Sequence, residues 1–289
     1  MGESVRVQLR DGAELWTAIS GSGPPVVCLH GGPGLWDYLA PLACLLDGEF
    51  AVVRFDQRGC GRSSGRHGPF TIEQAVEDLE QVRTAYGVVQ WAVVGHSWGA
   101  ELALRYAARH PRWTTAVVYI AGVGAGDDYE RPLVVELNRR LGPDRERWAA
   151  LSAIPDHDRT LAEEQERCLL QWRTDFSPGP QASRHAQALW QTRPAGALIN
   201  TAANRRLWQD RACTDLREDA TRVTCPVTMI FGHDDPRPWV TSDSVLAALP
   251  AATRTVLLGA GHAPWVERPA DVQAVITSAL RSPSPDQTA

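Results

Sequence analysis

Short apolar runs recur along the first 120 residues and return after residue 224, and stretches with helical periodicity separate most of them. We expect strands at 5–9, 15–19, 25–29, 51–55, 91–94, 115–120, 225–231 and 254–258. Helices are expected after Thr71, which has capping-box spacing to Gln74, and at 100–108 and 269–280. Parallel strands need a crossover between them, so this order predicts an α/β fold with a mostly parallel sheet flanked by helices.

The pattern changes between residues 124 and 220. β-type runs disappear there, while Arg, Glu, Gln, Ala and Leu dominate and four tryptophans occur at wide intervals. So many large apolar side chains favour a packed unit over a solvated linker. We therefore predict an inserted helical cap at 124–220, a discontinuous core formed by 1–123 and 221–289, and a frayed tail at 282–289.

Composition and charge exclude several classes of protein. The 289 residues are 44% hydrophobic and 22% charged, with a formal charge of −5, and no apolar run is long enough to span a bilayer. Basic clusters and a signal-peptide pattern are both missing, so we expect a cytoplasmic protein without a nucleic-acid or membrane partner. All 29 basic residues are Arg. The absence of Lys excludes Schiff-base chemistry, a Walker-type phosphate loop and a Ser-Lys dyad.

Six cysteines are spread widely along the chain, without a C-x-x-C pair or a Cys/His cluster at zinc-ligand spacing. We therefore expect most of them to be buried, reduced thiols, and we expect neither a metal nor a cofactor. Cys60 is the exception that stays open, because it lies in the Gly-rich loop 56–64 and its thiolate would be a nucleophile. Arg58 and Arg62 of the same loop are expected to fix it by ion pairing.

The strongest chemical signal is the segment 95–99, GHSWG, which matches G-x-S-x-G between a predicted strand and a predicted helix. In that context the pattern forms a nucleophile elbow, so Ser97 is the expected nucleophile. A serine hydroxyl needs a base, and the base needs an acid to orient it. His262 and Asp235, which each follow a predicted strand, are the expected base and acid. Asp234 remains an alternative acid, and Asp235 is preferred because its spacing from a preceding Gly fits G-x-x-D.

Acyl transfer also needs two backbone donors for the oxyanion. The amide of Trp98, directly after the nucleophile, is one expected donor. Gly32 in the loop 30–34 is the other, because a residue without a side chain lets its N–H approach the substrate. Three more tryptophans near these motifs fit either an aromatic-walled substrate pocket or ordinary core packing, namely Trp36, Trp239 and Trp265.

Five motifs together resemble the proline iminopeptidase branch of the α/β-hydrolases, a family of serine peptidases. They are HGGPG at 30–34, DQRGCGRSS at 56–64, GHSWG at 95–99, GHDD at 232–235 and GAGHAPWVERP at 259–269. The pairing of HGGPG with DQRGCGRS is more specific than any one motif alone. The resemblance implies an α/β-hydrolase fold with a helical cap, a triad in the chain order Ser, Asp, His, and release of an N-terminal residue, often proline.

The predicted cap departs from that family at the amine-binding position. An aminopeptidase holds a substrate ammonium with carboxylates, and family members usually place one of them directly after a cap Trp. Here Trp172 is followed by Arg173. Other acidic residues of the predicted cap could bind the amine instead, or simply lie on solvated helix faces. They are Asp127, Asp128, Glu163, Glu164, Glu166 and Asp175. Glu163, Glu164 and Asp175 are the preferred candidates.

These observations predict a metal-free serine hydrolase that acts by acyl transfer on a small-molecule or short-peptide substrate. The resemblance implies an amide bond to an N-terminal proline or other small residue as the first substrate. The alternatives are an esterase, thioesterase or lactonase acting on a small apolar acyl compound and, more remotely, a protein that only binds a ligand. The sequence leaves the oligomeric state open.

Overall fold

In the computed structural model, which describes residues 3–281, eight strands form one sheet. The predicted tail at 282–289 lies outside these residues. The strands follow the order β1 (Glu3–Gln8), β2 (Glu14–Ser20), β4 (Ala51–Phe55), β3 (Pro25–Leu29), β5 (Trp91–His96), β6 (Thr114–Ile120), β7 (Val227–Gly232) and β8 (Ala252–Leu257). β1 and β2 pair antiparallel at one edge, and every pairing from β4 to β8 is parallel. The predicted mostly parallel sheet is confirmed.

All eight predicted strands are present, with ends within two residues of those expected. The predicted helices correspond to α2 (Ile72–Ala85), α3 (Trp98–Arg109) and α12 (Pro269–Arg281). The hydroxyl of Thr71 caps α2 by accepting from the Gln74 N–H at 3.1 Å. Three helices of seven residues or fewer had no expected counterpart, because such lengths are too short to show a helical repeat. They are α1 (Ala40–Leu46), α10 (Asp243–Ala248) and α11 (Pro264–Glu267).

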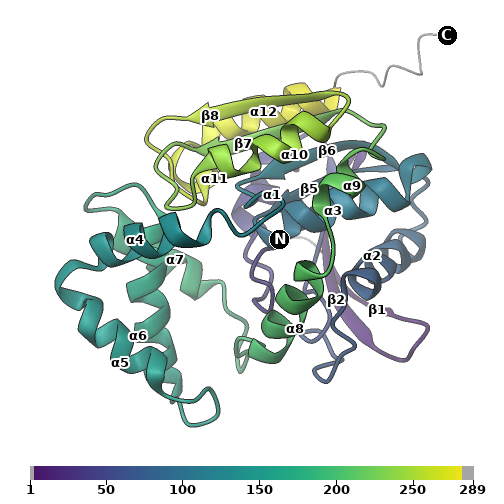
Figure 1. Ribbon diagram of the computed structural model, residues 1–289. Helices are drawn as coiled ribbons and strands as arrows, with labels where there is room; N and C mark the ends of the chain where they lie inside the picture. Colours follow the sequence, from purple (N-terminus) through teal and green to yellow (C-terminus); the bar gives the residue numbers. More distant parts are fainter. Residues whose placement is uncertain (1–2, 282–289) are drawn as a thin grey trace.

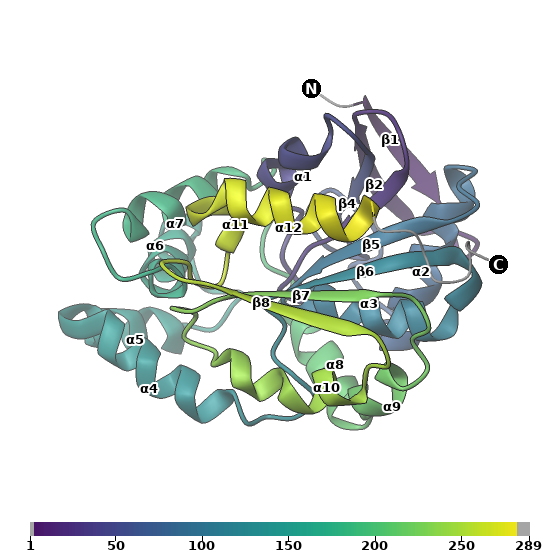
Figure 2. The same ribbon diagram turned by 90° about the horizontal axis from the view of Figure 1, so that it is seen from above.

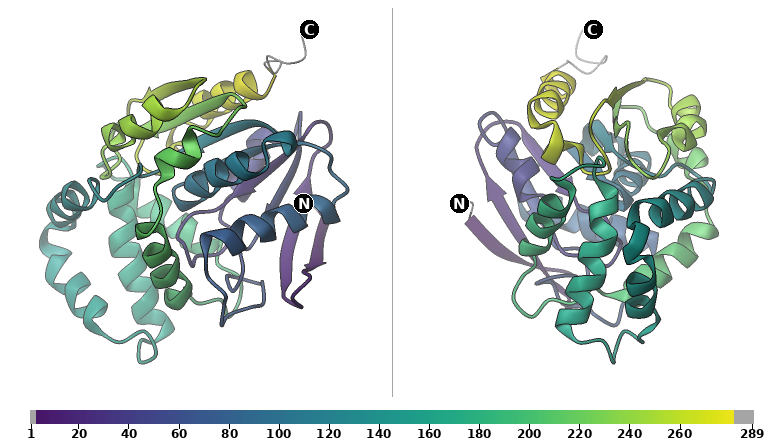
Figure 3. Two further views of the ribbon diagram at one scale, coloured as in Figure 1. Left: turned by 45° about the vertical axis from the view of Figure 1, so that its right-hand side comes forward. Right: turned by 90° about the vertical axis from the view of Figure 1, so that its left-hand side faces the viewer.

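Helices cover both faces of the sheet, and the side chains of each strand alternate between them. On β3, Val27 and Leu29 join the core cluster that includes α2 and α3. Val26 and Cys28 join the cluster that includes α1 and α12. Figure 2 shows α1 and α12 on one side of the sheet and α10 on the other, and Figure 3 shows α2 and α3 against the strands. Such burial on both faces is typical of parallel strands and explains their continuous apolar runs.

Six α-helices lie between β6 and β7 in the chain, within the segment predicted to be helical. The first five are α4 (Glu130–Leu141), α5 (Arg145–Ala153), α6 (Leu161–Trp172), α7 (Ala182–Gln191) and α8 (Thr201–Ala212). Figure 1 shows α4 to α7 grouped beside one end of the sheet, with α8 leading back to the core. α9 (Leu216–Ala220) comes at the end of the same segment and packs against α3. The residues between β6 and β7 therefore form an inserted group of helices, and the bounds 124 and 220 for a separate cap remain a prediction.

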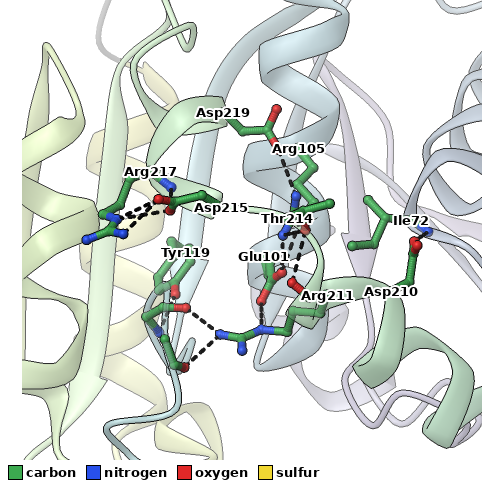
Figure 4. Close-up of polar contacts among 12 residues, drawn as sticks. Ile72, Glu101, Arg105, Tyr119, Asp210, Arg211, Thr214, Asp215, Arg217 and Asp219 are labelled. Carbon is green, nitrogen blue, oxygen red and sulfur yellow. Dashed lines mark hydrogen bonds and ion pairs between the residues drawn. The ribbon is translucent and has the colours of Figure 1, made fainter.

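A buried ionic network ties α8 to α3 (Figure 4). Glu101 of α3 accepts from Nη2 of Arg105 and from Nε of Arg211 on α8, each at 2.7 Å. Nη2 of Arg211 also donates to the carbonyls of Gly124 and Gly126 at 2.8 and 3.1 Å. All three ionic side chains are buried. The chain that enters the inserted helices and the chain that leaves them are thus held to the helix that follows β5.

Candidate active site

Ser97 occupies a strained turn between β5 and α3. Its φ of 56° and ψ of −119° lie outside the regions that most residues adopt, at a cost of about 1–3 kcal/mol. A Cβ on Gly95 would lie 2.0 Å from the Gly99 carbonyl oxygen, and a Cβ on Gly99 would lie 2.1 Å from the Leu29 carbonyl oxygen. Only glycine at these two positions lets the strand and the helix come this close. The turn therefore has the form of a nucleophile elbow, with Ser97 at its tip.

His262 and Asp235 come from the loops after β8 and β7. Nδ1 of His262 lies 2.6 Å from Oδ2 of Asp235, and both side chains are buried. Burial by itself would raise the pKa of the Asp235 carboxyl, but the charges and hydrogen bonds of His262 and Arg237 outweigh it and hold that pKa below its usual 3.8. Asp235 is therefore ionised at neutral pH, and its carboxylate assigns the proton of the neutral imidazole to Nδ1.

Asp234, the alternative acid, has a different partner. Its Oδ1 lies 3.0 Å from Nδ1 of His233, whose side chain is 57% exposed. Its own side chain is 29% exposed, whereas that of Asp235 is 2% exposed. Of these two adjacent carboxylates, the structure brings Asp235 to His262.

A cavity of about 400 Å³ is lined both by loops at the end of the sheet and by the inserted helices. Ser97, His262 and Gly32 line it from the loops after β5, β8 and β3. The carboxyl ends of parallel strands are where open α/β sheets bind ligands. A volume of this size suits a small molecule. The structure thus brings the expected nucleophile, base and oxyanion loop to one cavity.

Hydrogen bonds connect the loop 30–34 to the start of α3. Nδ1 of His30 donates to the Gly31 carbonyl at 2.8 Å, and its Nε2 accepts from the Gln57 N–H at 3.0 Å. Oε1 of Gln57 in turn accepts from the indole N–H of Trp98 at 3.0 Å. Trp98 is the first residue of α3, so its backbone N–H is one of the first-turn groups without an acceptor inside the helix. Gly32 follows in the same loop with a φ of 127°.

A family model described as alpha/beta hydrolase fold matches residues 24–269 of this chain. The chain belongs to the α/β-hydrolase fold family. This match confirms the family part of the sequence resemblance, and the sheet order and the elbow agree with it.

Similar α/β-hydrolases differ in their named activities. The putative carbamate hydrolase RutD of Escherichia coli O157:H7 is 28% identical over 278 residues, which cover 90% of this chain and 92% of that protein. A probable proline iminopeptidase of Streptomyces coelicolor is 37% identical over 155 residues, or 49% of this chain and 42% of that protein. The crystal structure of a proline iminopeptidase-related protein from Thermus thermophilus has a TM-score of 0.73 at 26% identity and covers 97% of both chains.

Two buried side chains of this α/β-hydrolase, His96 and Tyr38, join the loops of the site. Nε2 of His96 donates to the His262 carbonyl at 2.8 Å, and its Nδ1 accepts from the Tyr38 hydroxyl at 2.6 Å. The Tyr38 hydroxyl also accepts from the Gly31 N–H at 2.8 Å. Burial lowers the pKa of His96 well below 6.5 and keeps the ring neutral. The elbow motif contains His96, but its pairing with Tyr38 depends on how the loops pack.

The three tryptophans proposed as a substrate-pocket wall do not line this cavity. Trp36 packs edge-on against two tryptophans of the inserted helices. Trp265 stacks on an aromatic ring of the loop after β3, and Trp239 packs beneath an arginine. Their positions correspond to the alternative interpretation, ordinary core packing. The aromatic residues that do line the cavity, beside the buried Tyr38, are Trp172 and Phe176.

Of the three preferred carboxylates, only Asp175 lines the cavity. It forms an ion pair with Arg237 at 2.8 Å. Glu163 is half-buried and closes the capping box of α6, because its Oε2 accepts from the Thr160 N–H at 2.9 Å. Glu164 is buried behind the lining, between two arginines. The structure therefore does not bring Glu163 or Glu164 to the cavity surface.

Three arginines line the cavity, and no sequence pattern had assigned them to the site. They are Arg159, Arg167 and Arg237. The spacing of Glu164 and Arg167 predicts an ion pair on one helix face, which the structure contains at 2.7 Å. That spacing carries no information on whether the face points to solvent or to a cavity, so this signal alone does not identify the site.

The loop 56–64 supports the site and does not line the cavity. Cys60 is buried, and burial raises the pKa of its thiol to about 12, so the thiol remains protonated at neutral pH. Arg58 forms a bidentate ion pair with Asp78, with N–O distances of 2.6 and 2.8 Å. Nε of Arg62 donates a hydrogen bond to Asp56 Oδ2 at 2.6 Å. The expected ion pairing of both arginines is confirmed.

Residues 3–281 contain neither a metal-binding cluster nor a membrane-spanning helix. No group of three His, Cys, Asp or Glu side chains in that range is placed to hold a metal ion. Each helix in the described part of the chain is too short or too polar to span a bilayer.

Proposed function

We propose that the protein is a serine hydrolase that cleaves a small carbonyl compound by acyl transfer. The observation that carries this proposal is the strained Ser97, which opens onto the same cavity as a His262 held 2.6 Å from Asp235. Ser97 Oγ bonds to the substrate carbonyl carbon while His262 Nε2 takes the hydroxyl proton, and the N–H groups of Gly32 and Trp98 bind the oxyanion. The leaving group departs with that proton, and water then attacks the acyl-enzyme in the same way to release the acid and restore Ser97.

The charges that line the cavity favour an ester, thioester or lactone substrate over an N-terminal amine. An aminopeptidase needs carboxylates that are free to hold the substrate ammonium. The two carboxylates that line the cavity, Asp156 and Asp175, lie 3.4 and 2.8 Å from arginine nitrogens. Because three arginines line the same cavity, an ammonium would meet repulsion as well as attraction.

Release of an N-terminal proline or other small residue is the second candidate. The similarity to the Streptomyces coelicolor probable proline iminopeptidase supports it, as do the motifs HGGPG and DQRGCGRSS. Asp156 is the cavity carboxylate best suited to an amine, because its side chain is 49% exposed and its contact to Arg159 is the longer of the two.

Covalent labelling tests the nucleophile. Ser97→Ala should abolish labelling by a fluorophosphonate, whereas Ser152→Ala, which changes a second serine of the same cavity, should leave labelling intact. Labelling of Ser97→Ala at the full wild-type level would overturn the assignment.

Turnover separates the substrate classes. Acetyl and butyryl aryl esters are compared with prolyl and alanyl anilides on the wild type and on Ser97→Ala. Ester cleavage without anilide cleavage supports the first class, and efficient anilide cleavage supports the aminopeptidase. Absence of both activities together with absence of labelling would support a protein that only binds a ligand.

A further inference from the structure

One wall of the cavity is cationic. Arg159 lies in the loop between α5 and α6, Arg167 lies on α6, and both line the cavity with Gln171. The side chains of the two arginines are only 7% and 16% exposed. Guanidinium groups are rarely placed in such surroundings without a partner or a function.

Glu164, which does not itself line the cavity, forms ion pairs with both guanidinium groups. Its Oε2 accepts from Nη1 of Arg159 at 2.6 Å, and its two oxygens accept from Nη2 and Nε of Arg167 at 2.7 and 3.0 Å. Burial would raise the pKa of this carboxyl, but the arginines outweigh burial and hold it below 4.5. An ionised Glu164 therefore fixes the two guanidiniums in one orientation before any ligand binds.

Each guanidinium keeps hydrogen-bonding capacity. Nη2 of Arg159 gives one N–H to the Ile154 carbonyl at 2.6 Å, and Nη1 of Arg167 gives one to Gln171 Oε1 at 3.4 Å. Each of these nitrogens carries two N–H bonds. Among the residues that the structure describes, no oxygen accepts the second N–H of either nitrogen.

The wall formed by Arg159 and Arg167 also has a net positive charge. Two guanidiniums share one buried carboxylate, and the next acid, Asp156, is 49% exposed at 3.4 Å from Arg159. A partly solvated acid at that distance compensates less than a buried, bonded one. The excess is therefore at most one positive charge, which matches one carboxylate better than a phosphate dianion.

We propose that Arg159 and Arg167 form an anion subsite, and that the substrate carries a free carboxylate which binds there while its scissile carbonyl reaches Ser97. The planar, forked guanidinium suits a carboxylate with two oxygens. This inference rests on the proposed serine-hydrolase function and names the substrate class of the same cavity.

An apolar spacer completes the substrate. The cavity lining includes apolar side chains that can bury hydrocarbon, namely Leu35, Trp172, Phe176, Leu189, Ile199 and Ala263. The substrate class is thus a small ester, thioester or lactone of an acid whose alkyl or aryl spacer separates the reacting carbonyl from a free carboxylate.

Matched esters test the subsite. The first pair is 4-nitrophenyl hemiadipate and 4-nitrophenyl 6-methylheptanoate, which have similar shape but differ by one negative charge. The second pair places the charge on the leaving group, as 4-carboxyphenyl and 4-acetylphenyl butyrate. In at least one pair the wild-type kcat/KM should favour the charged member by about 10- to 100-fold, the range expected of hydrogen bonds to a charged group.

Variants assign the preference to the wall. Arg167→Gln should reduce the charged-to-neutral ratio at least tenfold, because Glu164 then neutralises the remaining arginine. Arg173→Gln is the matched control on the same stretch of chain, since Arg173 pairs with Asp144 at 2.7 Å and does not line the cavity. Its ratio should equal that of the wild type. An Arg173→Gln effect as large as that of Arg167→Gln would overturn the assignment.

Wild-type measurements keep the proposal testable if Arg167→Gln does not fold. Adipate should inhibit turnover of the neutral ester competitively, and dimethyl adipate should inhibit at least tenfold more weakly. Turnover of neutral esters without any preference for charge, in both pairs, would overturn the subsite and leave the serine-hydrolase proposal standing. If Ser97 is not labelled and no ester is cleaved, the proposed function fails, and calorimetric binding of adipate to the wild type decides the subsite by itself.

Discussion

Replacement of Asp235 by Asn is the sharpest test of how the site activates its nucleophile. In the wild type the carboxylate lies 2.6 Å from His262 Nδ1 in a buried setting. In the proposed mechanism His262 takes the Ser97 proton and becomes cationic. Charge centres about 4 Å apart at an effective dielectric constant of about 20 then attract each other by about 4 kcal/mol. Loss of that attraction lowers the rate by about 10³-fold. The Asn amide also permits the wrong imidazole tautomer, which moves the expected loss toward about 10⁴-fold.

The assay is kcat/KM for an aryl ester that the wild type cleaves, with Asp234→Asn as the matched control. Asp234 has a side chain that is 29% exposed, and it contacts the exposed His233. Exposed pairs of this kind contribute little, so Asp234→Asn should lose less than about fivefold. Circular dichroism and thermal melting should show that both variants are folded. Equal losses in the two folded variants, or a larger loss in Asp234→Asn, would refute the reasoning.

Two further predictions concern stability. Arg211→Gln should lower the free energy of unfolding in urea by about 2–3 kcal/mol, somewhat less than the loss typical of a broken buried pair, because Glu101 keeps a second arginine. Arg217 forms an exposed pair with Asp215 nearby, so Arg217→Gln should leave the urea midpoint of unfolding nearly unchanged. Equal losses of stability in the two variants would contradict a stabilising role of the buried network. The pKa of Asp235 is lowered in the folded protein, so its stabilisation is present above pH about 4 and is lost as pH falls through the folded pKa. Acid unfolding of Asp235→Asn, followed by circular dichroism, should therefore depend less on pH below about 4 than unfolding of the wild type, and an unchanged or steeper dependence would contradict the lowered pKa.

Strand positions could be predicted from the sequence because strands buried on both faces carry continuous apolar runs. The segments 25–29 and 51–55 are examples whose predicted and observed ends coincide. The short helix α1 could not be predicted in the same way. Its seven residues show too few turns for a periodic signal, and its position is set by packing against α11 and α12, which come more than 200 residues later.

The residues of the candidate site also differ in whether the sequence could predict them. Ser97, Asp235 and His262 could be predicted to lie together because each follows a strand of a parallel sheet, and the carboxyl ends of such strands share one edge. Arg159 and Arg167 could not be predicted, because which residues of the inserted helices face the site depends on how those helices pack over the loops. The spacing of charges along α6 predicts an ion pair and leaves its direction undetermined.

Asp175 shows why the carboxylates of this cavity are less available to a substrate than the arginines. Its side chain pairs with Arg237 at 2.8 Å, and its carbonyl accepts from the His262 N–H at 2.7 Å. The same Arg237 nitrogen lies 3.5 Å from Oδ1 of Asp235. Without Asp175, the half-buried Arg237 guanidinium would have Asp235 as its nearest carboxylate and would compete with His262 for it. Because Asp175 already pairs with Arg237, it is not free to bind a substrate ammonium. A negatively charged substrate group is compensated best at the wall formed by Arg159 and Arg167, where two cations share a single buried anion.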